Sequence, residues 1–150
     1  MKAVIQRVTS ASVTVDGKRI SAIKNGLMIL LGVQRGDTDE DEAYVIKKIL
    51  KLRIFDDPDG VMNLDITQVN GEILLVSQFT LLANTRKGNR PSYIEAEEPT
   101  LASARYDSVA KTLSQALGNP VQKGIFGADM QVCLTNNGPV TILLDSRAER

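Results

Sequence analysis

The chain has 150 residues, of which 43% are hydrophobic, and it carries 18 basic and 18 acidic side chains. This length and composition are typical of one globular domain, so we expect residues 1–150 to form a single unit with one core. No apolar run approaches the ~20 residues that span a bilayer, which predicts a cytoplasmic protein without a membrane partner. The net charge of zero argues against extended contact with DNA or RNA, although a local patch could still grip one nucleic-acid end.

Two residue types that often carry chemistry are scarce. The chain has no histidine, and Cys133 is its single cysteine. A disulfide framework and a cysteine- or histidine-ligated zinc site are therefore excluded, and we expect neither a metal nor another cofactor. Any hydrolytic reaction has to proceed without an imidazole base, which rules out a serine–histidine triad.

The first part of the chain alternates between apolar and polar residues, as half-buried strands do. The alternation predicts strands over residues 2–9, 12–15 and 19–23. Asp16-Gly17 is a strong hairpin signal between the last two. Residues 26–33 are continuously apolar, which predicts a central strand buried on both faces.

Helical spacing then appears twice. A helix begins at residues 37–40, whose acidic side chains complement the helix dipole, and a second helix fits residues 101–117. Residues 56–60 form a turn between these helices, and Asn70-Gly71 leads into a strand over 72–82. Two final strands are predicted at about 130–135 and 140–145, joined by a turn. The expected fold class is α+β: a mixed sheet or partly closed barrel with two main helices packed on it.

Ser77, Gln78, Phe79 and Thr80 are the first candidate site, because they follow directly on the buried run Ile73–Val76. An edge strand with solvated hydroxyls is the simplest interpretation. As nucleophiles, Ser77 and Thr80 have neither a histidine nor a Ser-x-x-Lys spacing to activate them. The remaining chemical interpretation is a site whose backbone N–H groups stabilise a developing oxyanion.

Gly138-Pro139 is the second candidate. Asn-Gly at a hairpin tip is ordinary, but a proline directly after it removes a backbone donor where the returning strand should pair. The cis isomer costs little at X–Pro bonds, about 0.5–1 kcal/mol, and would turn two neighbouring carbonyls the same way. Arg7 lies among apolar neighbours on the first strand. Its side chain either emerges at a strand end or holds backbone carbonyls, for which Gly138 and Pro139 are natural targets.

Arg86, Lys87 and Arg90 surround a flexible glycine in the third candidate, a loop that could cradle phosphates. A solvated loop is an equally good interpretation. Glu95, Glu97 and Glu98 follow closely and would partly cancel the field of the cations.

Four blocks together resemble the bacterial and eukaryotic type of D-aminoacyl-tRNA deacylase over essentially the whole chain. They are Gln6-Arg7-Val8, residues 77–81, residues 87–92 and residues 137–141. The resemblance implies hydrolysis of the ester between a D-amino acid and the 3′-terminal adenosine of tRNA. This is a proofreading reaction of translation, and glycyl-tRNA formed on tRNA(Ala) would be a further substrate.

The resemblance also assigns roles. It implies a homodimer with the active site at its interface. The backbone N–H groups of Phe79 and Thr80 would donate to the oxyanion, and the substrate's 2′-hydroxyl would assist. Gly138-Pro139 of the partner subunit, as a cis pair oriented by Arg7, would reject L-amino acids by a clash. The basic loop would contact tRNA, while DNA is not expected as a partner.

Two alternatives stay open. One is a related editing deacylase with a trans Gly–Pro bond and relaxed chirality. The other is a non-catalytic dimeric module that binds RNA ends through the loop at residues 86–91. The isomer of the Gly138–Pro139 bond and turnover of D- and L-aminoacyl esters discriminate among them.

Overall fold

The computed structural model describes residues 1–149 of the chain. Its strands are β1 (Lys2–Val15), β2 (Lys18–Ile23), β3 (Gly26–Gly32), β4 (Phe55–Asp56), β5 (Met62–Leu64), β6 (Glu72–Ser77), β7 (Gln122–Lys123) and β8 (Gln131–Asp145). Its helices are α1 (Asp39–Lys51), the short 3-10 helix η1 (Phe79–Leu82), α2 (Pro99–Leu117) and α3 (Ser146–Glu149). Within this described part, no helix is long and apolar enough to cross a membrane.

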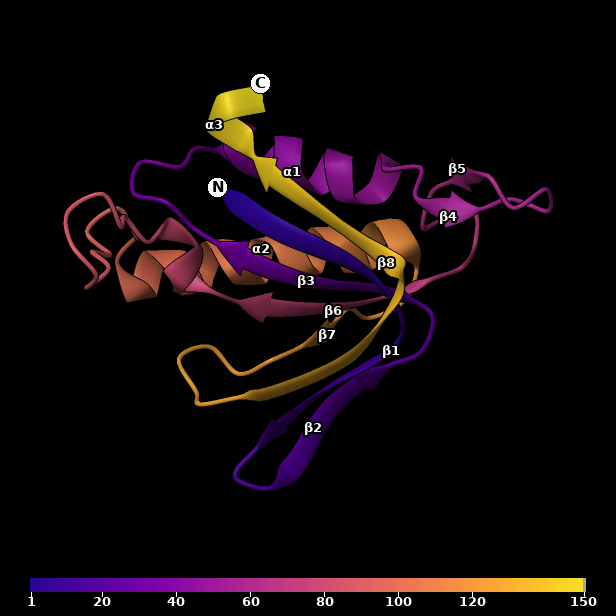
Figure 1. Cartoon of the computed structure of the whole chain (residues 1–150), viewed down its shortest axis with the longest axis horizontal. Helices are drawn as coiled ribbons and strands as arrows, with labels where there is room; N and C mark the ends of the chain where they lie inside the picture. The colour runs from indigo at the N-terminus through magenta and orange to yellow at the C-terminus, as the bar shows by residue number, and fades with distance from the viewer. Residues whose placement is uncertain (150) are drawn as a thin grey trace.

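A six-stranded mixed sheet has the order β2-β1-β3-β6-β7, with β8 paired to β1 (Figure 1). β1 is antiparallel to β2, β3 and β8, whereas β6 is parallel to β3 and β7. β1 pairs with β3 through its first half and with β2 through its second half, while β8 follows its other side. The sheet therefore curls into a nearly closed barrel, and the expected fold class is confirmed.

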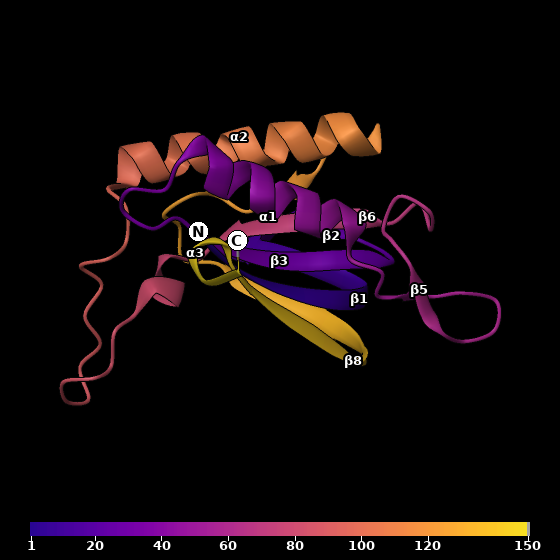
Figure 2. The ribbon, with the colours of Figure 1, turned by 90° about the horizontal axis from the view of Figure 1, so that it is seen from above.

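The helices α1 and α2 cover one face of the sheet, and β8 lies toward the opposite side (Figure 2). The main core fills the space between helices and sheet, with Ile29, Ile49 and Val109 fully buried in it. A second cluster fills the curled part of the sheet; it consists of Val8, Ala11, Val13, Ile23, Met28, Leu74 and Val76. The sheet face opposite the helices is thus left without a helical cover.

Local signals explain where the predicted elements begin and end. Asp16 and Gly17 have φ of 49° and 75°, as the tight β1–β2 hairpin requires. Thr38 and Asp41 form a capping box at the start of α1. The Glu98 side chain accepts from two backbone N–H groups at the start of α2, and Gly118 ends that helix in the left-handed region.

The strands expected over 2–9 and 12–15 are one strand, β1. Two further predicted elements were wrong, and both errors fall at candidate sites. The strand expected over 72–82 ends at Ser77, because the chain coils into η1. The predicted final hairpin is a single strand, β8. Gln6 pairs with Thr141 and Val8 with Asn136, so residues 137–140 bulge out opposite Arg7. The Asn-Gly pair therefore marks a bulge within one strand rather than a reversal of the chain.

Candidate active site

The first candidate block lies at the carboxyl end of β6, where the strand changes into η1. Gln78 N–H still donates to Leu31 O at 2.8 Å and so extends the pairing with β3. Gly32 allows η1 to pack onto this strand end, since a Cβ at that position would lie 2.6 Å from Leu82 Cδ2. Ser77, Gln78 and Thr80 are half-buried, whereas Phe79 is 56% exposed.

The backbone amides of Phe79 and Thr80 lie outside the hydrogen-bond ladder of η1. The first N–H of the turn that donates within it belongs to Leu81, which bonds Gln78 O at 3.2 Å. The amides that precede the first bond of a helical turn have no partner within it. The Gln78 Nε2 group donates to Thr80 Oγ1 at 2.5 Å and so fixes this hydroxyl as an acceptor. The block can therefore offer two backbone donors from a braced turn.

A pocket of about 280 Å³ adjoins this block. It is lined by Val33, Ser77, Phe79, Ala96, Glu97, Pro99, Ala102, Phe126 and Gly127. The ring of Phe79 packs edge-on against Tyr93, with centroids 5.1 Å apart and planes at 71°. The volume is near the lower end of the ~300–1,000 Å³ range of small-molecule sites. The pocket is thus suited to one small, largely apolar group.

The second candidate, Gly138-Pro139, is the exposed tip of the bulge in β8, and its peptide bond is cis. The base of the bulge is held from two sides. Val140 N–H donates to Asn136 Oδ1 at 2.8 Å, and Arg7 Nε donates to Asn137 O at 2.9 Å. The bulge is therefore a projecting backbone segment on a fixed base.

Arg7 is buried, with 7% of its surface exposed, and its guanidinium donates hydrogen bonds to the oxygen atoms around it. Besides Asn137 O, its Nη1 donates to Ile54 O at 2.8 Å and to Asp56 Oδ1 at 3.2 Å. The expectation that the fork holds backbone carbonyls fits these contacts, but the carbonyls belong to Asn137 and Ile54 rather than to Gly138 and Pro139. A lysine could not replace this planar fork.

The two candidates lie far apart within one chain. Ser77 pairs with Leu31, Leu31 with Ala3, and Ala3 with Leu144, so three strand-to-strand steps separate β6 from β8. Gly138 lies in the bulge opposite Arg7, four positions from Ala3 along β1. At ~4.8 Å between strands and ~3.3 Å per residue, the separation is roughly 20 Å. Gly138-Pro139 cannot reach the pocket of its own subunit without leaving the sheet.

The basic loop with Arg86, Lys87 and Arg90 is exposed and projects from the body between η1 and α2 (Figure 2). Two backbone bonds between Asn84 and Ser92 close its base, at 2.8 and 2.9 Å. Glu98, expected to cancel its field, is directed at the start of α2, where bonds from Thr100 and Leu101 lower its pKa. The loop keeps its cations near the pocket end of the molecule.

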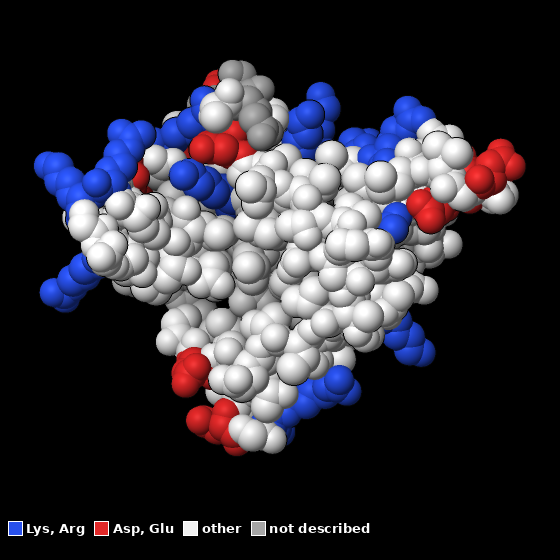
Figure 3. All heavy atoms as spheres, in the orientation of Figure 1, with Lys and Arg blue, Asp and Glu red and all other residues white. Residues whose placement is uncertain are grey.

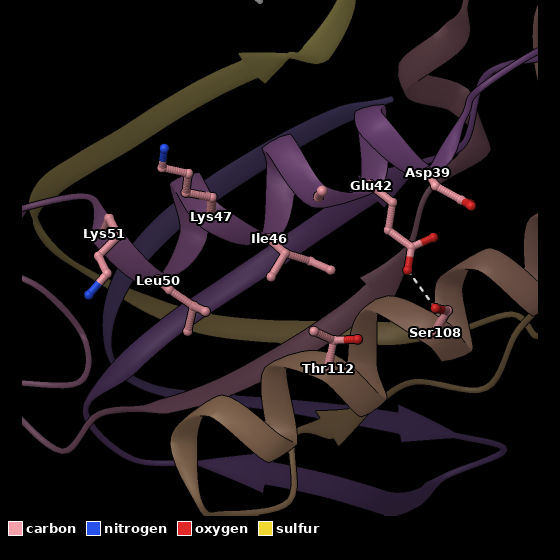
Figure 4. Close-up of a pocket in the computed structure, with 9 residues that line it drawn as sticks. Asp39, Glu42, Ile46, Lys47, Leu50, Lys51, Ser108 and Thr112 are labelled. Carbon is pink, nitrogen blue, oxygen red and sulfur yellow. Dashed lines mark hydrogen bonds between the residues drawn. The ribbon is translucent and has the colours of Figure 1, made fainter.

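A larger hollow lies elsewhere, between α1 and α2, with a volume of about 630 Å³ (Figure 4). Its floor includes Ile46 and Leu50, and Glu42 accepts from the Ser108 hydroxyl at one end. Glu42 is also paired with Arg105 at 2.7 Å. These side chains bind one another across the two helices.

Comparison with known proteins decides the family. The family model for D-Tyr-tRNA(Tyr) deacylase matches residues 4–145. The chain belongs to this family. A D-aminoacyl-tRNA deacylase of Flavobacterium psychrophilum is 54% identical over 147 residues, 98% of each chain. The protein of the same name from Porphyromonas gingivalis is also 54% identical, over 97% of each chain.

Two solved structures superimpose on nearly the whole chain. A structure titled c-Myc DNA Unwinding Element Binding Protein superimposes with a TM-score of 0.92 at 44% identity, covering 97% of this chain and 98% of that one. A probable eukaryotic D-amino acid tRNA deacylase has a TM-score of 0.81 at 18% identity, covering 95% and 97%. The second likeness shows the fold alone. The resemblance expected from the four sequence blocks is confirmed.

Sequence reasoning missed several residues around the candidate site. Ile54 and Asp56 hold Arg7, and no local pattern marks a backbone carbonyl as an arginine ligand. Tyr93 and Phe126 shape the surroundings of the pocket. Tyr93 follows the basic loop directly, so an aromatic residue beside a phosphate-binding pattern was the one available signal.

Proposed function

We propose that this protein hydrolyses the ester bond of D-aminoacyl-tRNA and releases the free D-amino acid and tRNA. The observation that carries the proposal is the identity of about 54% with deacylases of that name over nearly the full chain. The reaction is a carboxylic ester hydrolysis that removes wrongly charged D-amino acids before translation uses them. Such proofreading acts in the cytoplasm, where aminoacyl-tRNA is consumed.

The proposed mechanism relies on backbone donors. The N–H groups of Phe79 and Thr80 are free of the η1 ladder and would stabilise the oxyanion that forms when water attacks the ester carbonyl. Ser77 and Gln78 would shape and brace the pocket, Gln78 through its bond to the Thr80 hydroxyl. The 2′-hydroxyl of the terminal ribose would assist the attack, which suits a chain without histidine.

The site is completed, we propose, by a second copy of the chain. Gly138-Pro139 lies roughly 20 Å from its own pocket by strand register, and in this proposal a copy related by a two-fold axis would supply it. The face without helices is mostly uncharged over β1, β3 and β8, with charges at its margin (Figure 3). On this face, Leu143 of the edge strand β8 is 70% exposed. A long edge strand with exposed apolar side chains favours burial against a partner.

Chiral selection would follow from the projecting backbone. The carbonyls of Gly138 and Pro139 would occupy the space that an L side chain needs, while a D side chain points away from them. Rejection by a clash requires no complementary pocket, so many D-amino acids would be accepted. Glycine has no side chain to reject, and hydrolysis of glycyl-tRNA, including that formed on tRNA(Ala), is therefore part of the proposal.

Arg86, Lys87 and Arg90 would hold the acceptor end of the tRNA. Their loop projects beside the pocket end of the molecule, and its cations are exposed. A single-stranded end needs few phosphate contacts, which agrees with the net charge of zero. Duplex DNA serves as a control ligand, since one solved relative carries a DNA element in its title.

The test is incubation of the protein with D-tyrosyl-tRNA and L-tyrosyl-tRNA in parallel. The proposal predicts release of D-tyrosine, with L-tyrosyl-tRNA left intact and glycyl-tRNA cleaved. Equal release of both enantiomers would indicate an editing deacylase of relaxed chirality. Binding of tRNA without turnover of any ester would instead indicate a non-catalytic module and would overturn the proposal.

A further inference from the structure

Four cations gather on the C-terminal half of α1 and just beyond it. Lys47, Lys48, Lys51 and Arg53, here called the basic patch, line a hollow of about 410 Å³ together with Tyr44 and Leu52. Figure 4 shows Lys47 and Lys51 on this half of the helix, whereas Asp39 and Glu42 lie at its other end. Blue side chains crowd the same edge of the surface in Figure 3, over the end of α1. The helix is thus polarised, with a concentrated positive surface at one end.

The basic patch forms no ion pair within the described part of the chain, although Lys48 Nζ lies over the Tyr44 ring, 5.7 Å from its centroid. Hydrogen bonds from Thr67 and Gln68 outweigh burial and lower the pKa of Asp65, and the charge of Lys51 adds only the smallest contribution. Within the described residues, the Arg53 guanidinium donates a hydrogen bond only from its Nε, to Asn63 O at 2.8 Å.

Nearby acids also have other partners. Asp57 accepts from the backbone of Asp59 and Val61 in its own turn, at 2.9 and 3.0 Å. Asp56 is paired with Arg7. The dipole of α1 accounts for lysines in its last turn, but not for Arg53 beyond its end. Several cations that form no ion pair in the described chain match the chemistry of nucleic-acid phosphates.

The basic patch adjoins the bulge of β8 through a short chain of contacts. Arg53 precedes Ile54, whose carbonyl accepts from Arg7 at 2.8 Å. Arg7 in turn holds Asn137, next to Gly138. A partner's pocket that receives Gly138-Pro139 would therefore have the basic patch of the donating subunit beside it.

We propose that the basic patch of one subunit binds the acceptor-stem phosphates of the tRNA whose ester lies in the pocket of the other subunit. This inference rests on the proposed function and on the proposed dimer. One tRNA would then contact both copies: its 3′ end lies in the pocket beside Ser77 and Phe79, and its stem lies on the partner's α1. The patch contributes affinity for the RNA body and takes no part in the chemistry.

The experiment uses the full-length triple variant Lys47→Gln, Lys48→Gln, Lys51→Gln. Its matched control is Lys18→Gln, Arg19→Gln, Lys24→Gln, which removes three exposed cations around β2. Dissociation constants for uncharged tRNA are measured over a salt series, and hydrolysis is followed for D-tyrosyl-tRNA and for 3′-D-tyrosyl-adenosine, which lacks a stem. Circular dichroism verifies folding. If the triple variant does not fold, the three single variants replace it.

The proposal predicts a dissociation constant weakened on the order of tenfold and a salt slope reduced by about three, or about one for each single variant. KM for D-tyrosyl-tRNA rises by a similar factor, while hydrolysis of the adenosine ester and all values for the control variant stay at the wild-type level. Unchanged tRNA affinity and salt slope, or an equal loss in the control variant, would overturn it. The proposal would also be overturned if the triple variant lost binding to phosphatidylserine vesicles but kept wild-type binding of tRNA.

Failure of the proposed function would give a different experimental result, which is seen with the wild-type protein. If wild-type protein cleaves neither the tRNA ester nor the adenosine ester, the hydrolase assignment fails. The tRNA affinity and salt slope of the triple variant still decide whether the basic patch binds RNA.

Discussion

Arg7 Nε donates to the carbonyl oxygen of Asn137 at 2.9 Å, across 130 positions of the chain. The same guanidinium donates to Ile54 O, so one buried side chain ties β1, the bulge of β8 and the segment after α1 together. Together with the bond from Val140 N–H to Asn136 Oδ1, this residue holds the bulge in position. Its tip can project because its base is held.

Arg7→Ala should therefore damage both the fold and the site. The change removes charged hydrogen bonds worth about 1.5–3 kcal/mol each and leaves two carbonyls without their donor. We expect the free energy of unfolding to fall by about 3 kcal/mol and D-tyrosyl-tRNA hydrolysis to fall at least tenfold. Arg7→Lys should recover part of the stability but little activity, because it lacks the fork. Urea denaturation and single-turnover kinetics measure the two effects. Arg19→Ala, on exposed β2, is the control, and an Arg7→Ala enzyme as active as this control would contradict the assigned role.

Thr80→Ala and Thr80→Pro separate the hydroxyl from the backbone amide. Alanine keeps the N–H, so we expect activity within about tenfold of wild type despite the lost bond from Gln78. Proline removes the N–H and should lower kcat by about 10²–10³. The measurement is kcat on D-tyrosyl-tRNA, with folding checked by circular dichroism. An alanine variant as inactive as the proline variant would show that the hydroxyl itself is essential.

Leu143→Glu tests the proposed dimer face. Leu143 is 70% exposed on β8, and a carboxylate there would have to be buried against a second copy. Sedimentation should show a shift from dimer toward monomer, and hydrolysis should fall in parallel because each pocket loses its partner's bulge. Val61→Glu, at a site 57% exposed in the β4–β5 turn, provides the control for a new surface charge. A Leu143→Glu variant that stays dimeric would place the interface elsewhere.

Asp41 should make stability depend on acid pH. Burial raises its pKa, but bonds from Ser146 and Thr38 and the Met1 ammonium outweigh burial and hold the pKa well below 3.8. A depressed folded-state pKa gives stability that is complete above the unfolded value and is lost as the pH falls below it. The free energy of unfolding should thus begin to decrease below about pH 5 and go on falling below pH 3. Asp41→Asn should be less stable at pH 7 and show a shallower acid decline in urea titrations. Asp129→Asn, at an exposed position, should follow wild type.

Periodicity predicted most of the fold because most strands and helices here obey their patterns. Alternation found the β1–β2 hairpin, and the apolar run found the central strand β3. The misjudged elements lie where tertiary contacts override local signals. β8 continues through Asn-Gly because β1 pairs with it on both sides of the bulge and Arg7 fills the gap.

The candidate site was predictable in part. Ser77–Thr80 was recognisable as polar residues closing a buried strand, but its turn into η1 depends on packing against Gly32, which no pattern reveals. The partners of Arg7 come from a segment about fifty residues away, and backbone carbonyls leave no mark in a sequence. A site built from two copies is also invisible to periodicity, because one chain contains only halves that never meet.

The cross-subunit site is the central claim, and subunit mixing tests it most directly. Thr80→Pro disables the pocket but keeps the bulge. Gly138→Val should distort the bulge, because a Cβ at this position would lie 2.9 Å from Val140 Cγ2 and the backbone φ is 135°. We expect this variant to reduce hydrolysis at least tenfold.

In a mixed dimer, the intact pocket of one variant meets the intact bulge of the other. Random mixing after unfolding and refolding should then restore about a quarter of wild-type activity, since half of the dimers regain one of two sites. If the site is shared between subunits, D-tyrosyl-tRNA hydrolysis should recover in a mixture that mass spectrometry shows to contain mixed dimers. No recovery in that mixture would contradict a site shared between two subunits.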